Sequence, residues 1–158
     1  MKNLNQYIAG LLLLLTCVSC SKNKEKSGCL PVALILPAFK FQVVDKNSGN
    51  DLFFSPSPAY SINDIKIVFK NQENKLDSIS PPQRTNAGTG SYFVYIVPFS
   101  RIADTCYIKI KALKTDTVIS TIERIKTECG SNDGVIKVQV NKEAPIANSN
   151  KTIIVIKK

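Results

Sequence analysis

The sequence predicts an all-β domain, an antiparallel β-sandwich, behind a short N-terminal leader. Apolar and polar residues alternate over several stretches, most clearly at 64–70 and 105–113. Clusters of Gly, Pro, Asn and Asp separate these stretches, and β-branched residues are frequent within them. No stretch after residue 30 has the apolar spacing of an amphipathic helix. Eight to ten short strands separated by turns are typical of a two-layer sandwich.

The first strands are expected on either side of Pro37. Residues 32–36 (VALIL) form a short continuous apolar run that Pro37 ends, which predicts a buried strand. Residues 40–45 alternate between apolar and polar. The turn formers at 46–50 follow them, and we expect a hairpin that returns through residues 51–54.

The middle of the chain predicts two clear strands and a long loop. Residues 64–70 alternate cleanly, and a weak strand follows at 75–79. Residues 81–91 (PPQRTNAGTGS) are polar and predict the longest loop. Residues 92–97 are apolar on both faces, as expected of a central strand. Alternation places Phe41 and Val43 on one face of the strand at 40–45, and it turns Ile65, Ile67 and Phe69 inward in the strand at 64–70.

The last third continues the strand pattern. Residues 105–113 alternate, and residues 116–126 are rich in Thr, Val and Ile, so both predict strands. Asn-Asp-Gly at 132–134 is a strong turn signal before a strand at 135–141. A polar linker then leads to a final strand at 152–156. The predicted sandwich is immunoglobulin-like or transthyretin-like in general shape, although the absence of Trp removes the immunoglobulin core signature.

The leader has the layout of a secretory signal. Lys2 precedes an apolar run at 8–15, and small residues lead to Cys20. The run is too short to span a bilayer, which takes roughly 20 apolar residues. A cysteine after Val18-Ser19 resembles the cut site of a bacterial lipoprotein, and this resemblance implies a diacylglycerol on the Cys20 sulfur. Cys17 is the alternative lipid site, but it follows Thr16, a poorer residue at the cut.

The expected organisation is therefore a signal peptide at 1–19, a lipidated cysteine with a flexible tether at 20–29, and the β-sandwich at 30–158. The tether (SKNKEKSG) carries three lysines and no large apolar residue, so it has nothing to bury. The leucine run, SCSK, the lysine tether and, more loosely, VVDKNSGNDLFF resemble small uncharacterised lipoproteins of Bacteroidota. That resemblance implies no known activity.

The tether also bears on location. Ser21 rather than Asp follows the lipid site, which by resemblance to the proteobacterial sorting rule implies the outer membrane. Surface export in Bacteroidota is associated with acidic residues after the cysteine, whereas here lysines outnumber Glu25. We therefore expect the periplasmic face rather than the cell surface, with an envelope protein or a glycan as partner.

Charge and histidine content narrow the function classes. The formal net charge is +9, or about +8 without Lys2, and the lysines are scattered rather than gathered with aromatic residues. A nucleic-acid partner is therefore not expected. The chain has no histidine, which removes the usual zinc site and the His-dependent nucleophilic sites. We expect a non-enzymatic binding or structural role. A carboxylate-dependent hydrolase is the remaining catalytic hypothesis. The candidate catalytic acids are Asp45, Asp51, Asp64, Glu123 and Glu128.

The cysteines after the lipid site suggest one disulfide. Cys29 and Cys129 lie beside glycines at segment ends, and an exported protein meets conditions in which disulfides persist. Their bridge is a prediction, since a third thiol allows other pairings. Cys106 shares a strand face with Ile108 and Ile110, so we expect a buried, packed thiol.

The turn at 45–51 supports an alternative function. Asp45, Asn47 and Asp51 offer oxygens at alternate positions around a glycine, which partly resembles a calcium loop. The pattern departs from the EF-hand, because the glycine is at the fifth position and Pro56 occupies the twelfth. A plain hairpin turn requires the same residues. A calcium- or carbohydrate-binding module therefore stays open as the alternative, with Tyr60 and Tyr107 the aromatic residues expected to be most exposed.

Overall fold

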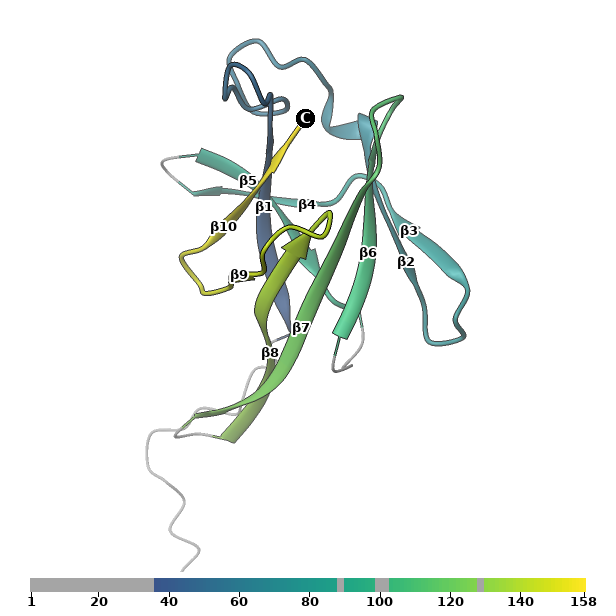
Figure 1. The fold of residues 1–158 in the computed structure, drawn as a ribbon, viewed down its shortest axis with the longest axis vertical. Coiled ribbons are helices and arrows are strands. Elements are labelled where there is room, and N and C mark those ends of the chain that lie inside the picture. Colours follow the sequence, from purple (N-terminus) through teal and green to yellow (C-terminus); the bar gives the residue numbers. More distant parts are fainter. Residues whose placement is uncertain (1–35, 88–89, 99–102, 128–129) are drawn as a thin grey trace, which may run out of the picture. The chain divides into compact units, whose positions relative to one another are not determined.

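The computed structural model describes residues 36–87, 90–98, 103–127 and 130–158 (Figure 1). They belong to one unit of the chain, Val32–Lys158. Cys20, Cys29 and Cys129 lie outside the described residues, as do Cys17, the tether and most of the run at 32–36. The described chain forms ten strands and one 3-10 turn, Ile62–Asp64. None of the helical structure in these ranges is long and apolar enough to cross a membrane.

One layer is a four-stranded sheet with the order β10-β1-β5-β4. Its strands are β1 (Ala38–Val44), β4 (Gln83–Ala87), β5 (Gly90–Ile96) and β10 (Ile153–Lys157). The β1–β5 and β5–β4 pairs are antiparallel, whereas β1 and β10 run parallel, with Phe41 opposite Ile154. The predicted antiparallel sandwich is thus correct apart from this pair, which joins strands from the two ends of the domain.

The other layer is a six-stranded antiparallel sheet with the order β3-β2-β6-β7-β8-β9. Its strands are β2 (Ile65–Lys70), β3 (Leu76–Ile79), β6 (Ala103–Ile110), β7 (Asp116–Thr127), β8 (Gly130–Val140) and β9 (Ile146–Ala147). β7 and β8 continue past the end of their neighbour β6 as a two-stranded ribbon (Figure 1).

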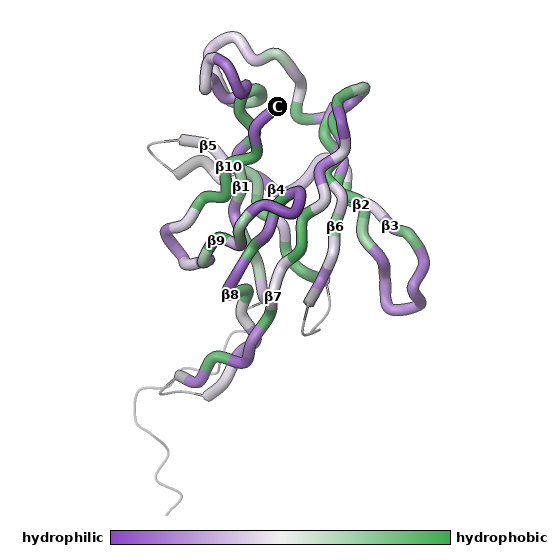
Figure 2. The backbone as a smooth tube through the Cα atoms, in the orientation of Figure 1, coloured by the Kyte–Doolittle hydropathy of each residue, from purple (hydrophilic) through white to green (hydrophobic). Residues whose placement is uncertain are grey.

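The two sheets enclose one apolar core, which makes the fold sandwich-like. Alternation predicted these faces correctly, because Ile65 and Ile67, expected inward, are at most 1% exposed, and Phe41 and Val43, expected on one face, are both buried. Figure 2 shows apolar stretches along the strands and hydrophilic residues at the β2–β3 connection. Aromatic rings from both layers meet in this core, where the centroids of Phe69 and Tyr95 are 6.3 Å apart.

Two sequence predictions in the loops are wrong. Residues 83–87 form strand β4 rather than part of a loop, pairing with β5 from Gln83 opposite Val94 to Ala87 opposite Gly90. This edge strand has no apolar alternation, so its polar composition concealed it. Residues 132–134 lie within β8 and pair with residues 123–125 of β7 instead of forming a turn.

The run at 51–54 is also not a strand. Asp51 forms a single antiparallel bridge with Val44, and the chain then turns. Leu52 and Phe53 nevertheless enter the core, with 9% and 4% of their surface exposed. Burial of these side chains rather than strand pairing accounts for the apolar run that suggested a second hairpin strand.

Candidate binding cleft

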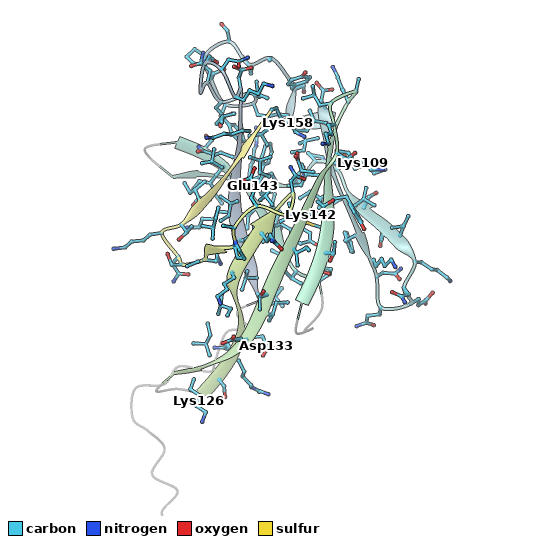
Figure 3. The ribbon with its side chains drawn as sticks, in the orientation of Figure 1. Lys109, Lys126, Asp133, Lys142, Glu143 and Lys158 are labelled. Carbon is cyan, nitrogen blue, oxygen red and sulfur yellow. The ribbon has the colours of Figure 1, made fainter. Side chains whose placement is uncertain are left out.

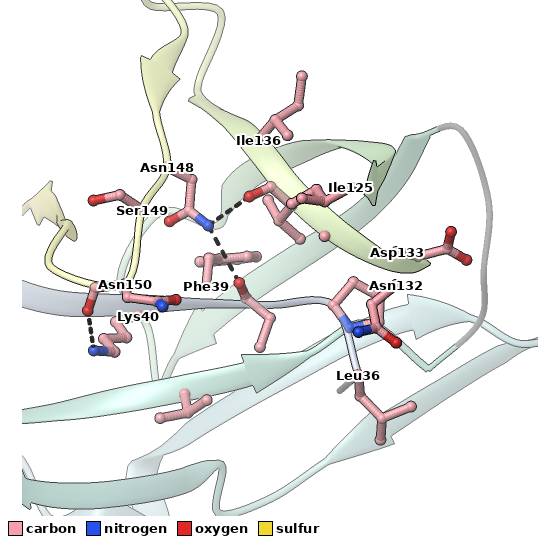
Figure 4. A pocket seen from close by; sticks show the side chains of 15 residues that line it. Leu36, Phe39, Lys40, Ile125, Asn132, Asp133, Ile136, Asn148, Ser149 and Asn150 are labelled. Carbon is pink, nitrogen blue, oxygen red and sulfur yellow. Dashed lines mark hydrogen bonds between the residues drawn. The ribbon is translucent and has the colours of Figure 1, made fainter. Parts of the chain in front are cut away.

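A cleft of about 430 Å³ opens beside the start of β1 (Figure 4). The described residues that line it come from five parts of the chain: residues 36–40, Val94 of β5, Ile125 of β7, residues 132–136 of β8, and residues 148–150 ahead of β10. The volume falls within the range of ligand-binding pockets, about 300–1,000 Å³. Residues remote in sequence therefore meet at one concave surface.

Asn148 ties the two sheets together at this cleft. Its side-chain Nδ2 donates to the carbonyl oxygens of Val135 at 2.8 Å and Ala38 at 3.3 Å, as Figure 4 shows. Its backbone N–H donates to the Ile136 carbonyl at 2.8 Å. The buried Oδ1 atom has no hydrogen-bond partner among the described residues. A buried acceptor without a donor is costly, so a ligand N–H or O–H group would satisfy this oxygen once the atoms that cover it move aside.

Apolar side chains form the wall of the cleft. Leu36 and Ile125 both line the cleft and are 48% and 46% exposed, so they present aliphatic surface to it. A Cβ atom at Gly134 would lie 2.5 Å from the Cδ1 atom of Ile125. Glycine at this strand position therefore lets the Ile125 side chain lie across β8, and a substitution would displace it.

The charged groups of the cleft are few. The Lys40 ammonium donates to the Asn150 carbonyl at 2.6 Å and lies 5.1 Å from the centroid of the Tyr92 ring. Asp133 is the one acidic residue among the described residues that line the cleft. Glycoside hydrolysis by carboxylates uses a pair of acids that flank the scissile bond. This lining is suited to holding an apolar ligand with a few polar groups.

The turn at 45–51 lies elsewhere. Asp45 Oδ1 accepts hydrogen bonds from the backbone N–H of Ser48 at 2.7 Å and of Asn47 at 3.0 Å, and from the Ser48 hydroxyl. These bonds, chiefly those from Ser48, lower the pKa of Asp45. Asp51 Oδ1 accepts from the N–H groups of Phe53 and Phe54, and its buried Oδ2 has no partner among the described residues.

The calcium site predicted at Asp45, Asn47 and Asp51 stays a prediction. The hydrogen bonds just described are those of a turn, and they occupy one oxygen of each carboxylate. Across the described ranges, no group of three or more His, Cys, Asp or Glu side chains is placed to hold a metal ion.

The other acids of the hydrolase hypothesis have separate surroundings. Asp64 caps the 3-10 turn by accepting from the Ser61 N–H at 2.9 Å, and it pairs with Lys111 at 3.0 Å. Lys111, followed by Ser61, lowers the pKa of Asp64. Glu123 is exposed on β7, and Glu128 lies outside the described residues. Neither Asp64 nor Glu123 lines the cleft.

A buried polar cluster lies between the sheets. Tyr95 on β5 donates its hydroxyl to Asp104 Oδ2 on β6 at 3.1 Å. Cys106, two residues along β6, is 1% exposed and carries a free thiol. Burial, and then the Asp104 charge, raise the pKa of Cys106. The sequence prediction of a packed thiol is confirmed.

Sequence reasoning missed the cleft and its central residue. Asn148 was part of a polar linker, and nothing local distinguishes it from the neighbouring Asn150. Tyr60 and Tyr107, expected to be the most exposed aromatic residues, are half-buried, and the Tyr60 ring lies 6.0 Å from that of Phe53.

None of the protein-family models, curated proteins or solved structures compared with the chain matches it. The function must therefore be argued from the leader sequence, the sandwich-like fold and the cleft.

Proposed function

We propose that this protein is a non-enzymatic, lipid-anchored component of the bacterial cell envelope that binds a partner in the cleft. The anchor is the diacylglycerol at Cys20, on the outer membrane, with the domain facing the periplasm. The support for this part is the leader sequence, with its short apolar run and small residues before Cys20. We also propose that the strands of the sandwich are arranged as in immunoglobulin-like or transthyretin-like domains.

The observation that carries the binding role is the combination of an apolar wall with an unpartnered acceptor. Leu36 and Ile125 leave about half of their surfaces exposed, and Asn148 Oδ1 is buried without a donor among the described residues. A partner that covers the aliphatic side chains and donates one hydrogen bond satisfies both features. The apolar contacts and the hydrogen bond both become more favourable when the partner excludes water from the cleft.

The occupant that fits best is an extended apolar peptide segment of another envelope protein. Backbone N–H groups of such a segment supply the donor that Asn148 Oδ1 lacks, provided that binding uncovers this buried oxygen. The cleft is bounded by strand or strand-like backbone at residues 36–40 and 132–136, against which an extended chain packs well. Alternate side chains of the segment then meet Leu36 and Ile125.

A photo-crosslinking residue in place of Ile125 tests this function in cells. We expect an adduct with a second envelope protein that disappears when Leu36→Asp is added. Leu76 is the control position, because it is 68% exposed but does not line the cleft. The same adduct from Leu76, or a crosslink from Ile125 only to residues of its own chain, contradicts the proposal.

One observation favours the alternative, a calcium-binding turn. Asp51 Oδ2 is buried and has no partner among the described residues, so it has an oxygen to offer a cation. Asp45 and Asn47 supply the remaining oxygens from the same turn. This alternative needs no contribution from the cleft, so substitutions at the two places distinguish the functions.

A further inference from the structure

Strand register brings together lysines that are scattered in the sequence. In the β2–β6 pair, Lys66 lies directly opposite Lys109, and Val68 lies opposite Tyr107. The residues on either side of Lys66 and Lys109 are buried in the core, so the two lysines point to the outer face of the six-stranded sheet. Both are exposed, and Figure 3 labels Lys109 on β6.

Two more lysines share this outer face. Lys70 lies opposite Leu76 of β3, next to the buried Phe69. Lys137 lies opposite Thr121 of β7, next to the buried Val138. We call the surface formed by these four lysines and one tyrosine the lysine face; its members are Lys66, Lys70, Tyr107, Lys109 and Lys137.

The charge of the lysine face is not neutralised within the described chain. The ion pairs found there join Lys75 to Glu73, Lys111 to Asp64 and Lys158 to Asp116, and none includes a lysine of this face. Among the described residues, strand alternation places one acid, Glu123, on the same side of the sheet. Like charges directly opposite each other destabilise a strand pair, so the Lys66–Lys109 pair opposes folding unless an anion lies over it.

We propose that the lysine face binds an acidic polysaccharide. The four ammonium groups lie on one side of a sheet whose neighbouring strands are about 4.8 Å apart, so an extended polyanion meets several of them at once. Between them lie Tyr107, Thr117 and Thr121, which offer a half-buried ring and hydroxyl groups to a sugar. This binding does not depend on the cleft or on the lipid anchor.

An anionic bilayer is the competing partner for a positively charged surface. A bilayer also favours protruding apolar side chains. Next to the lysine face, Val68 and Ile119 are half-buried, whereas Leu76, at one end beside Lys70, is largely exposed. The polar and half-buried character of the centre of the face therefore favours the polysaccharide.

Calorimetric titration of the purified full-length protein in neutral detergent tests the proposal, with polygalacturonate as the probe and neutral dextran as the blank. The double variant Lys66→Gln/Lys109→Gln should bind polygalacturonate about tenfold more weakly or worse. Its melting temperature should not fall, because the substitution removes a repulsive pair. The control is the double variant Lys142→Gln/Lys151→Gln, which loses the same charge at exposed positions outside the lysine face. Its affinity for polygalacturonate should lie within about twofold of that of wild type.

Three results overturn the proposal. Equal weakening in the two double variants means that binding follows net charge and has no site. Equal binding of dextran and polygalacturonate means that the lysines do not select the ligand. Binding of short-chain phosphatidylglycerol through Lys66 and Lys109, without binding of polygalacturonate, assigns the face to a bilayer instead.

Discussion

Lys158, labelled in Figure 3, and Asp116 form a buried ion pair that joins the two sheets of the domain. Lys158 follows β10 of the four-stranded sheet, whereas Asp116 begins β7 of the six-stranded sheet. Their side chains are 8% and 3% exposed. The Lys158 ammonium also donates to the Lys114 carbonyl, and Asn141 Nδ2 donates to Asp116 Oδ1 at 2.6 Å. Both charges are thus paired and further hydrogen-bonded.

Removing one partner of this pair should strongly destabilise the domain. Lys158→Met leaves the Asp116 carboxylate buried without its cation, which costs about 3–5 kcal/mol of unfolding free energy in comparable pairs. Urea denaturation measures the change. Lys157→Met is the control, because Lys157 is exposed and its loss should cost less than about 0.5 kcal/mol. Equal stability of the two variants would show that the pair contributes nothing.

The buried Cys106 thiol should be inert and should make the fold sensitive to alkali. Burial raises the pKa of Cys106 in the folded state, while the unfolded thiol titrates near 8.5. Above about pH 8.5 the unfolded state therefore binds fewer protons than the folded state, and stability falls as pH rises. Burial also raises the pKa of Tyr95, which adds to the loss above about pH 10.

Melting temperatures measured from pH 7 to 11 check the predicted loss of stability in alkali. Thiol labelling of native and unfolded protein checks that Cys106 is inert. In Cys106→Ala the decline between pH 8.5 and 10 should be shallower than in wild type, while the decline above pH 10 remains. Rapid labelling of Cys106 in the native protein at pH 8 is inconsistent with the packing described here.

The predicted Cys29–Cys129 disulfide should be found by mass spectrometry of unreduced protein, as a peptide pair that separates on reduction. Closing a loop of about 100 residues stabilises a fold by about 4–5 kcal/mol in the chain-entropy model. Reduction should therefore lower the melting temperature of wild type and leave that of Cys29→Ser/Cys129→Ser unchanged. Free thiols at both positions would refute the pairing.

Calcium separates the two interpretations of the turn at 45–51. If it is only a turn, whose own N–H and hydroxyl groups satisfy Asp45 Oδ1, calcium and chelator should leave the melting temperature unchanged. A bound ion instead raises it with calcium concentration, and Asp51→Asn should remove that rise. Magnesium at the same concentration controls for ionic strength. We expect the first outcome.

The strands that sequence predicted well are those with one buried face. Alternation located β2 and β6 and their inward residues, because Ile65, Ile67 and Ile108 must face the core whatever the topology. β4 was missed because an edge strand needs no apolar face. Gly134 suggested a turn, yet it lies in β8, paired with Glu123, where the missing Cβ leaves room for the Ile125 side chain.

The candidate sites depend on contacts between remote segments, which is why the sequence did not predict them. Asn148 contacts Ala38 and Val135 across 110 and 13 residues of chain. The parallel β1–β10 pair, which brings residues 148–150 to the cleft, has no local signature. The lysine face likewise depends on register, since Lys66 and Lys109 are adjacent only after β2 pairs with β6.

Lipid labelling tests the central claim, an envelope protein anchored through Cys20, most directly. Cells fed a labelled fatty acid should yield labelled wild-type protein and labelled Cys17→Ala, whereas Cys20→Ala should carry no label. Protease added to intact cells should spare the wild-type domain if it faces the periplasm. If the lipid persists in Cys20→Ala and is lost in Cys17→Ala, the anchor is Cys17 instead. The absence of lipid from the wild-type protein would contradict the account.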